Sequence, residues 1–352
     1  MNSSSPSWED VFATLATKSE LSAPQIEWAM NEILEGASST ENTKRFLLAL
    51  KEKGETADEV NSLVDCMYRK ASLIEIPDRA VDIVGTGGDG ANTINISTTA
   101  AIITTAAGAR TIKHGNRAAT SRSGAADLLE SLGINITLGA KGVAECVRKI
   151  GIGFAFAPTF HPAMKHAAQA RKELGVPTIF NILGPLANPA KPQCVAIGVA
   201  RAELLETVAE VLAKRGCEGF VFRGDDGLDE VSLSTTTTVL IIKDGVLRRE
   251  IFDPSEIGLE KFPLSALKGG TPDENAQITR GIFAGELGAY RESVLINAAA
   301  AIAAFKGDFH LGIEQQFANG YVLAKQAVDS GAALHLVERW ADLSNELAKS
   351  SL

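Results

Sequence analysis

The stretch Val81-Asp-Ile-Val-Gly85-Thr-Gly-Gly-Asp89-Gly90 joins a short apolar run to a group of glycines, and hydroxyl and amide side chains follow between Thr93 and Thr98. A strand that ends in glycines and then opens a helix presents backbone N–H groups to phosphate oxygens. A second polar turn, Lys113-His-Gly-Asn-Arg117, follows the next apolar run and precedes Ser121-Arg-Ser-Gly124-Ala-Ala-Asp127. Together these turns predict a site for a phosphorylated substrate.

The chain around these turns alternates between strand-like and helix-like patterns. Short β-rich runs occur at 81–84, 110–113, 134–138, 153–156, 195–199, 219–223 and 236–243, with helical patterns between them and a helical tail from about 273. This alternation predicts the α/β class, with a mostly parallel central sheet covered by helices on both faces. Ligands of such sheets bind at the carboxyl ends of the strands, where the glycine turn would lie.

The first 76 residues follow a different pattern, with apolar residues at helical spacing from Trp8 to about Glu75 and no strand signal. Residues 158–188 become helical again. We therefore expect a small N-terminal all-helical domain of residues 1–76, completed by helices within about 158–188. A larger α/β domain would comprise residues 77–157 and 189–352. Because a small bundle buries little surface by itself, we also expect a homodimer through the helical domain.

Composition narrows the class of protein. The 352 residues carry a net charge of −9 with scattered basic residues, which argues against nucleic acid as a partner. The four cysteines, Cys66, Cys146, Cys194 and Cys217, show no paired spacing, which favours reduced thiols. The polar start lacks a signal core, and the apolar runs are too short to cross a bilayer. We expect a cytoplasmic protein with no membrane segment.

The glycine turn also matches G-x-G-x-x-G, so a dinucleotide-binding oxidoreductase is one alternative. That interpretation needs an acidic residue about twenty positions further on to bind the ribose, and this window instead holds Arg110, Lys113 and His114. An ordinary glycine turn is the structural alternative. The hydroxyl and amide groups that follow the turn favour a phosphate site over both.

Two further features bear on the chemistry. The segment Gly224-Asp-Asp-Gly-Leu-Asp229-Glu230 carries four carboxylates, which fit Mg²⁺ held between protein and substrate phosphates, although an acidic surface turn would show the same pattern. Arg171 lies at the edge of an apolar helix face, and its guanidinium can bind a carboxylate through two hydrogen bonds. Spacing alone, however, favours an arginine on the helix surface. No set of residues predicts a covalent nucleophile or an obligatory base.

The ordered set of motifs resembles the anthranilate phosphoribosyltransferase family. The resemblance rests on the turns already quoted and on Asn95-Ile-Ser-Thr98, His161-Pro-Ala-Met164, Asn181-Ile-Leu-Gly-Pro-Leu186 and Asp226-Gly-Leu-Asp-Glu230, which together span essentially the whole chain. It implies transfer of phosphoribose from phosphoribosyl pyrophosphate (PRPP) to the amino group of anthranilate in tryptophan biosynthesis. It further implies a fold of one helical and one α/β domain, and Mg²⁺, about two ions per subunit.

The resemblance also implies roles for particular residues. Ser97 would help to bind one magnesium ion, and Asp229 and Glu230 the other. Gly85, Asn116 and Arg171 would receive anthranilate. The PRPP site would comprise Gly85, Gly88, Asp89, Thr93, Asn95, Ile96, Ser97, Thr98, Lys113, His114, Gly115, Asn116, Arg117, Ala118, Ala119, Thr120, Ser121 and Ala125.

Two rival functions remain open from the sequence. A pyrimidine nucleoside phosphorylase would share the architecture, but its lysine-serine-arginine phosphate motif fits Lys113-His-Gly-Asn116 poorly. A homologue that binds nucleotide or nucleic acid without transferring a group is the non-enzymatic alternative. The donor and magnesium motifs favour the transferase over both.

Overall fold

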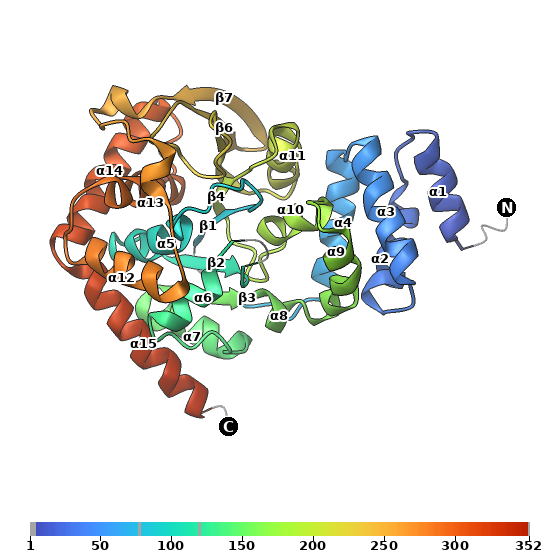
Figure 1. The fold of residues 1–352 in the computed structure, drawn as a ribbon, viewed down its shortest axis with the longest axis horizontal. Helices are drawn as coiled ribbons and strands as arrows, with labels where there is room; N and C mark the ends of the chain where they lie inside the picture. The colour runs from blue at the N-terminus through green and yellow to red at the C-terminus, as the bar shows by residue number, and fades with distance from the viewer. Residues whose placement is uncertain (1–4, 77–78, 119–120, 351–352) are drawn as a thin grey trace.

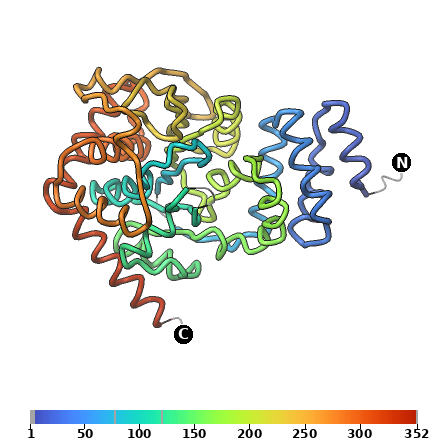
Figure 2. The backbone as a smooth tube through the Cα atoms, in the orientation of Figure 1, coloured from blue at the N-terminus to red at the C-terminus, as the bar shows by residue number. Residues whose placement is uncertain are grey.

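The computed structural model describes residues 5–76, 79–118 and 121–350. A helical part lies at one end of the molecule and a larger α/β part at the other, with the chain's start in the helical part and its end at the far tip of the last helix (Figures 1 and 2). The expected α/β class with an N-terminal helical domain is confirmed.

A mixed sheet of seven strands in the order β3-β2-β1-β4-β5-β6-β7 forms the centre of the α/β part. The first five strands are parallel, and β6 and β7 add antiparallel to one edge. The strands are β1 (Val81–Gly85), β2 (Thr111–Gly115), β3 (Ile152–Phe156), β4 (Cys194–Gly198), β5 (Glu218–Gly224), β6 (Thr237–Lys243) and β7 (Val246–Phe252). The chain runs outward through β2 and β3 and returns to β4, so β1 and β4 flank the point where the strand order reverses.

Helices cover both faces of this sheet. On one face α5 and α13 pack against β1 and β4, and on the other face α10 and α11 pack against β2, β5 and β6. The helices of this part are α5 (Ile96–Ala106), α6 (Ala125–Ser131), α7 (Ala140–Ile150), α11 (Leu205–Lys214), α12 (Pro272–Phe283), α13 (Ala289–Lys306), α14 (Ile313–Asp329) and α15 (Ala332–Ser350). Short 3₁₀ turns complete it: η2 (Ala202–Leu204), η3 (Pro254–Ile257) and η4 (Leu264–Leu267).

The helical part joins two segments that are distant in sequence. Its first helices are α1 (Trp8–Ala16), α2 (Ala23–Leu34), α3 (Thr40–Lys53) and α4 (Ala57–Arg69). The later segment supplies α8 (Ala157–Phe160), η1 (Pro162–Ala167), α9 (Ala168–Leu174) and α10 (Ile179–Leu186). Helices α9 and α10 pack against α3, and α10 also contacts α4.

One apolar cluster runs through this helical part and on to the sheet. It contains Leu47 and Val64 of the first helices, Phe180 and Leu183 of α10, and Val221 of β5, so its core is continuous with one sheet face. Because no gap in the core marks where one unit ends, the division into residues 1–76 with 158–188, and 77–157 with 189–352, stays a prediction.

A buried carboxylate fixes the start of α4. Glu59 forms a capping box with Thr56, and it also accepts hydrogen bonds from Leu21 N at 2.8 Å and Lys53 Nζ at 2.6 Å. A buried charge is tolerated where it is paired and fully hydrogen-bonded. This contact joins the connections that precede α2 and α4.

Two details differ from the sequence prediction. Residues 134–138 were expected to form a strand, and the expectation is wrong: Ile134, Ile136 and Leu138 alternate into the core, but no neighbouring strand pairs with this segment. Strand β7 was not predicted, because the polar run Arg248-Arg-Glu250 interrupts its apolar residues, and most of its side chains are not buried. The turn Asp244-Gly245, with both residues at positive φ, connects it to β6.

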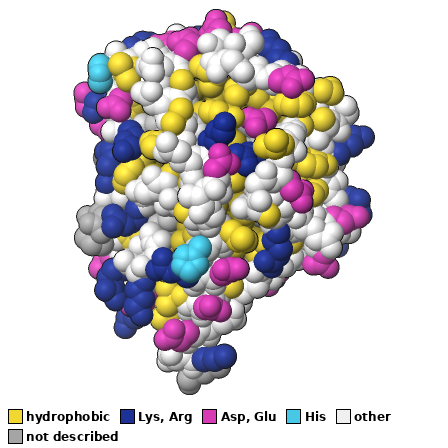
Figure 3. Space-filling model, turned by 90° about the vertical axis from the view of Figure 1, so that its left-hand side faces the viewer, with side chains coloured by type: hydrophobic (Ala, Val, Ile, Leu, Met, Phe, Trp, Pro, Cys, Tyr) yellow, Lys and Arg dark blue, Asp and Glu magenta, His cyan; other side chains and the backbone are white. Residues whose placement is uncertain are grey.

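The surface carries mixed charge. Lysine and arginine side chains lie among acidic and apolar ones on the face of the α/β part that points away from the helical part (Figure 3). In the described part of the chain, no helix combines the length and the apolar character needed to cross a membrane. All four cysteines are free thiols; Cys217 is half-buried and the other three are buried.

Candidate active site

The glycine turn lies where the strand order reverses between β1 and β4. Thr86 N donates to Gly198 O at 2.9 Å, and Thr86 Oγ1 accepts from Ala200 N at 3.1 Å. A switch point between parallel strands is the usual ligand position in such sheets. The first turn therefore opens at the expected edge of the sheet.

The acidic segment after β5 folds over these glycines. Gly87 N donates to Asp229 Oδ2 at 2.6 Å. A Cβ atom on Gly198 would overlap the Asp229 carbonyl, and one on Gly85 would overlap its carboxylate. Glycine is thus required at both strand ends, because the carboxylate occupies the space of a side chain.

Asp229 and Glu230 are buried carboxylates that lie together. Burial, followed by the negative charge of nearby Asp89, raises the pKa of Asp229 to about 7. Burial and the adjacent Asp229 raise the pKa of Glu230 well above its ordinary value, and the charge of Lys113 and a hydrogen bond from Ser97 partly oppose this rise. Buried like charges of this kind are stabilised by a cation.

The charge of Lys113 acts on both of these carboxylates. Its ammonium group is buried and donates to Ile83 O at 2.6 Å and to Ser97 Oγ at 3.3 Å. Burial lowers the pKa of Lys113, while the charges of Asp82, Glu230 and Asp229 act in the opposite direction. One lysine cannot neutralise three carboxylates, so the cluster keeps an excess of negative charge.

This cluster fits a magnesium ion that is also held by substrate phosphate. No group of three or more His, Cys, Asp or Glu side chains in the described residues could hold a metal ion by itself. Mg²⁺ usually takes only one or two protein carboxylates and completes its shell with water and phosphate oxygens. Asp229 and Glu230 match that need, with the Ser97 hydroxyl beside them.

Asp225 and Asp226, the other two carboxylates of the segment, have a structural role. Asp226 accepts from Leu228 N at 3.2 Å and from Ser232 Oγ at 2.7 Å. Asp225 accepts from the hydroxyls of Thr236 and Thr238. Both carboxylates stabilise the turn that positions Asp229 and Glu230.

The start of α5 faces the same edge. Asn95 is its N-cap residue, but its side chain donates to Ser123 O at 3.0 Å and accepts from Ser123 Oγ and Asn275 Nδ2. Asn95 therefore links the start of α5 to the loop before α6 and to helix α12, and its amide is not free. Ile96 and Thr98 are buried, so the backbone N–H groups of this first helical turn are what a phosphate could reach.

The second polar turn, after β2, is fixed by α6. Asp127 accepts from Ala118 N at 3.0 Å and from Gly124 N at 2.9 Å, which closes the loop between them. Arg117 forms ion pairs with Asp127 and Glu130, which raise its pKa, so its guanidinium points to α6. Ser121 is exposed. Ala119 and Thr120 lie outside the described residues.

Side chains of this turn differ in accessibility. His114 Nδ1 donates to Gly184 O at 2.7 Å, and burial lowers the His114 pKa to about 3, so this ring is neutral and contacts α10. Gly115 sits against Phe154, and a Cβ there would lie 2.8 Å from the ring. Asn116 is exposed, and its Oδ1 accepts from Arg117 N at 2.7 Å.

Arg171 lies on α9, on the helical side of the same edge. Its side chain is half-buried and burial lowers its pKa, yet no hydrogen bond or ion pair reaches its guanidinium from the described residues. The glycine turn approaches the connection after α9, since a Cβ on Gly88 would lie 3.8 Å from Pro177 Cγ. A partly desolvated arginine without a partner is suited to bind a carboxylate.

The remaining expected residues also lie on these two turns. Thr93 pairs with Lys268 in an isolated bridge, and Ala125 opens α6. Sequence reasoning missed Asp82, whose carboxylate accepts from Asn188 Nδ2 at 2.8 Å. A carboxylate between Val81 and Ile83 in an apolar strand was the available signal. Asn275 gave no such signal.

Family models match nearly the whole chain. Residues 9–71 match the helical bundle domain of the glycosyl transferase family, and residues 77–334 match the a/b domain of the same family. A relative from Rhodococcus jostii, an anthranilate phosphoribosyltransferase, is 50% identical over 343 residues, covering 97% of this chain and 95% of that protein.

Solved structures agree with this match. The anthranilate phosphoribosyltransferase from Thermus thermophilus has a TM-score of 0.88 and 37% identity, covering 96% of this chain and 99% of that one. The Saccharomyces cerevisiae protein, in complex with PRPP and Mg, has a TM-score of 0.85 and 29% identity, with coverage of 97% and 99%. It has also been solved with 4-fluoroanthranilate.

Asp229→Asn should raise the free energy of unfolding above pH 7. The folded-state pKa of about 7 exceeds the ordinary 3.8, so the protonated carboxyl is favoured in the folded state. Wild-type stability relative to the variant is lost as pH rises from about 4 to about 7. Above pH 7 the free energy of unfolding of Asp229→Asn should exceed that of the wild type by about 2–4 kcal/mol, measured by urea unfolding without metal ions.

The control for this comparison is Asp342→Asn, which removes an exposed carboxylate on α15. Its stability should follow the wild-type curve at every pH. Parallel curves for wild type and Asp229→Asn would contradict the raised pKa.

Proposed function

The chain belongs to the anthranilate phosphoribosyltransferase family, and we propose that it transfers the phosphoribosyl group of PRPP to the amino group of anthranilate. Pyrophosphate is the leaving group, and the product is N-(5-phosphoribosyl)anthranilate. The reaction belongs to tryptophan biosynthesis. The observation that carries this proposal is the buried pair Asp229–Glu230, which lies against the glycine turn beside Lys113.

The donor binds across the two polar turns in this proposal. Backbone N–H groups of the glycine turn and of the first turn of α5 would bind the phosphate oxygens. Lys113 would stabilise negative charge that develops on the departing pyrophosphate. Ser97, Asp229 and Glu230 would hold Mg²⁺, two ions per subunit with the substrate's help; bound Mg²⁺ neutralises phosphate charge and so assists departure.

The acceptor binds between the second turn and α9. Arg171 would receive the anthranilate carboxylate in a two-point contact, because it is half-buried and its guanidinium has no partner among the described residues. Asn116, which is exposed at the end of β2, would orient the amino group. Holding both substrates in line reduces the entropic cost of the reaction.

Little acid–base catalysis is needed. An arylamine is neutral near pH 7 and can attack the ribose carbon as oxocarbenium character develops there. The neutral, buried ring of His114 contacts α10, so its placement supports the absence of a general base at this position. The residues therefore act through position and charge.

We also propose a cytoplasmic homodimer that associates through the helical domain. The helical part presents exposed apolar side chains, Leu48 at 43% and Val176 at 46% exposure, which a second copy would cover.

The proposed reaction can be followed by the loss of anthranilate fluorescence. We expect a decay that needs the protein, PRPP and Mg²⁺ together and that stops when EDTA is added. Fluorescence that stays constant, while calorimetry still detects PRPP binding, would keep the phosphate site but exclude anthranilate as the acceptor.

Arg171→Ala should raise the KM for anthranilate by roughly 10- to 100-fold, because the loss of a hydrogen bond to a charged group costs about 1.5–3 kcal/mol. The KM for PRPP should change little. The matched control is Lys172→Ala, which removes an exposed cation from the adjacent position. An unchanged anthranilate KM in Arg171→Ala would remove this residue from the acceptor site.

A further inference from the structure

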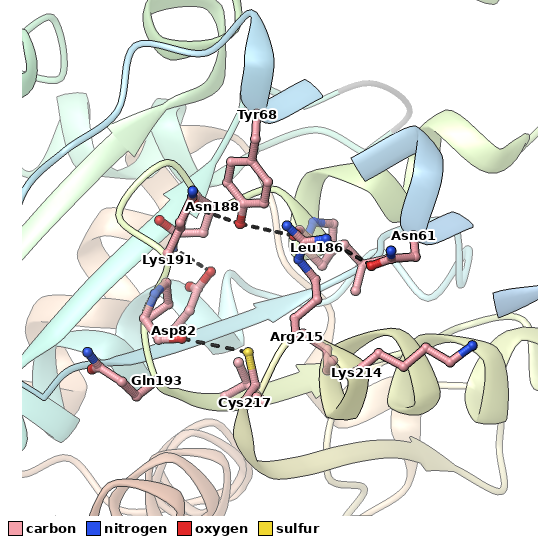
Figure 4. A pocket seen from close by; sticks show the side chains of 15 residues that line it. Asn61, Tyr68, Asp82, Leu186, Asn188, Lys191, Gln193, Lys214, Arg215 and Cys217 are labelled. Atoms are coloured by element: carbon pink, nitrogen blue, oxygen red, sulfur yellow. Dashed lines mark hydrogen bonds between the residues drawn. The ribbon is translucent and has the colours of Figure 1, made fainter. Parts of the chain in front are cut away.

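A cavity of about 380 Å³ lies at the amino ends of the parallel strands, away from the site described above. Its lining includes Asp82, the second residue of β1, Val195, the second residue of β4, and Cys217, which directly precedes β5 (Figure 4). Helix α4 of the helical part closes it from one side through Tyr68. The proposed PRPP site lies at the carboxyl ends of the same strands, so the cavity is a separate place.

Part of the cavity lining is apolar. Leu186, Val195 and Leu212 line it and are buried. The rest of the lining is mostly polar and includes Asn61, Asn188 and Gln193, so the cavity combines a small apolar surface with several polar groups. A ring or a short apolar chain could therefore be enclosed here.

Its rim is cationic and contains an aromatic ring. Lys191 Nζ lies 4.7 Å and the Arg215 guanidinium 4.9 Å from the centre of the Tyr68 ring. Tyr68 Oη donates to Asn188 O at 3.1 Å, which fixes the ring between the two cations. Tyr68 and Arg215 point toward one another in Figure 4.

The charges at the rim are not balanced. Lys214 and Arg215 form ion pairs with Asp58 and Asp65, at 2.6 and 2.8 Å. Within the described residues, no carboxylate pairs with Lys191. Asp82 is the one carboxylate of the lining.

Asp82 does little to offset Lys191. It is buried and is already hydrogen-bonded to Asn188 Nδ2 and His114 N. Burial also raises the Asp82 pKa to about 6. The positive charge of Lys191 is therefore not offset by Asp82, and a ligand anion can pair with it.

The backbone at Lys191 is strained. Its φ is +48°, a left-handed conformation that L-residues other than glycine rarely adopt, and Pro192 follows it. Glycine would relieve this strain. Strained residues cluster at ligand sites, and here the strained residue carries the unpaired cation of the rim.

We propose that this cavity binds a small amphipathic anion, with its carboxylate or phosphate group at Lys191 and Arg215. The apolar body of the ligand lies against Leu186, Val195 and Leu212. The site lies at the opposite ends of the strands from the transferase site, and Asp82 of its lining also accepts from His114 N of the second polar turn.

Cys217 supplies a local test in the full-length protein, since it lines the cavity and the other three cysteines are buried. Burial raises its pKa to about 11, so alkylation by iodoacetamide is followed at about pH 9 by mass spectrometry of its peptide. Phenyl phosphate or benzoate, each at about 5 mM, should slow this alkylation by about threefold or more. Inorganic phosphate carries only the anionic group, and benzyl alcohol carries only the apolar ring. Each of them should protect Cys217 much less.

The variants Lys191→Gly and Lys18→Gly form a matched pair. Lys18 is also an exposed lysine at positive φ, +56°, but it does not line the cavity. Protection should disappear in Lys191→Gly and persist in Lys18→Gly, with wild-type transfer activity in both. Protection by benzoate alone would assign a carboxylate ligand, and protection by phenyl phosphate alone a phosphate ester.

Three results would overturn the proposal: no protection by either anion, equal protection by benzyl alcohol, or protection retained in Lys191→Gly. Calorimetry gives an answer independent of thiol reactivity. Phenyl phosphate should bind wild type with one more site per chain than Lys191→Gly, because any binding at the transferase site is common to both. Equal numbers of sites would also contradict the proposal.

Discussion

The burial of Asp229 and Glu230 beside one another is the constraint on which the rest of the site depends. Two adjacent carboxylates with raised pKa values destabilise a folded protein unless a cation offsets them. Lys113 supplies one positive charge from β2, and the remaining excess suits a metal ion shared with a phosphorylated substrate. The excess negative charge therefore lowers the stability of the free protein and favours the binding of a metal ion with its charged substrate.

The architecture serves this cluster in a direct way. The strand order reverses between β1 and β4, which leaves space at their carboxyl ends, and glycines at 85 and 198 let the acidic segment approach both strands closely. Asn95 joins the start of α5 to Ser123 and Asn275, so hydrogen bonds fix this helix start to the loop before α6 and to α12. Arg171 lies on α9 of the helical part, and the connection after α9 approaches the glycine turn at Pro177.

Much of this could be predicted from local sequence patterns. The alternation of short apolar runs and helices gave the α/β class, because buried parallel strands and amphipathic helices have different periods. The glycine turn and the Asp229–Glu230 segment marked the edge of the sheet where ligands bind. Arg171 was ambiguous from spacing alone, and its expected role came from the family resemblance.

Other features depend on contacts between distant segments, which local patterns do not contain. The run at 134–138 has the alternation of a strand but lacks a neighbour to pair with. In edge strand β7, the polar run Arg248-Arg-Glu250 interrupts the apolar pattern. The Arg117 side chain points toward α6 because it pairs with Asp127 and Glu130, and local sequence does not show where these two residues lie. The strain at Lys191 and the cavity beside it are visible only in three dimensions.

The most direct test of the central claim is a crystal structure of this chain with PRPP and Mg²⁺. The account predicts electron density for a metal ion between the pyrophosphate and the carboxylates of Asp229 and Glu230, with the Lys113 ammonium beside the same phosphate group. A pyrophosphate that binds away from these carboxylates, with no metal ion between them, would contradict the account.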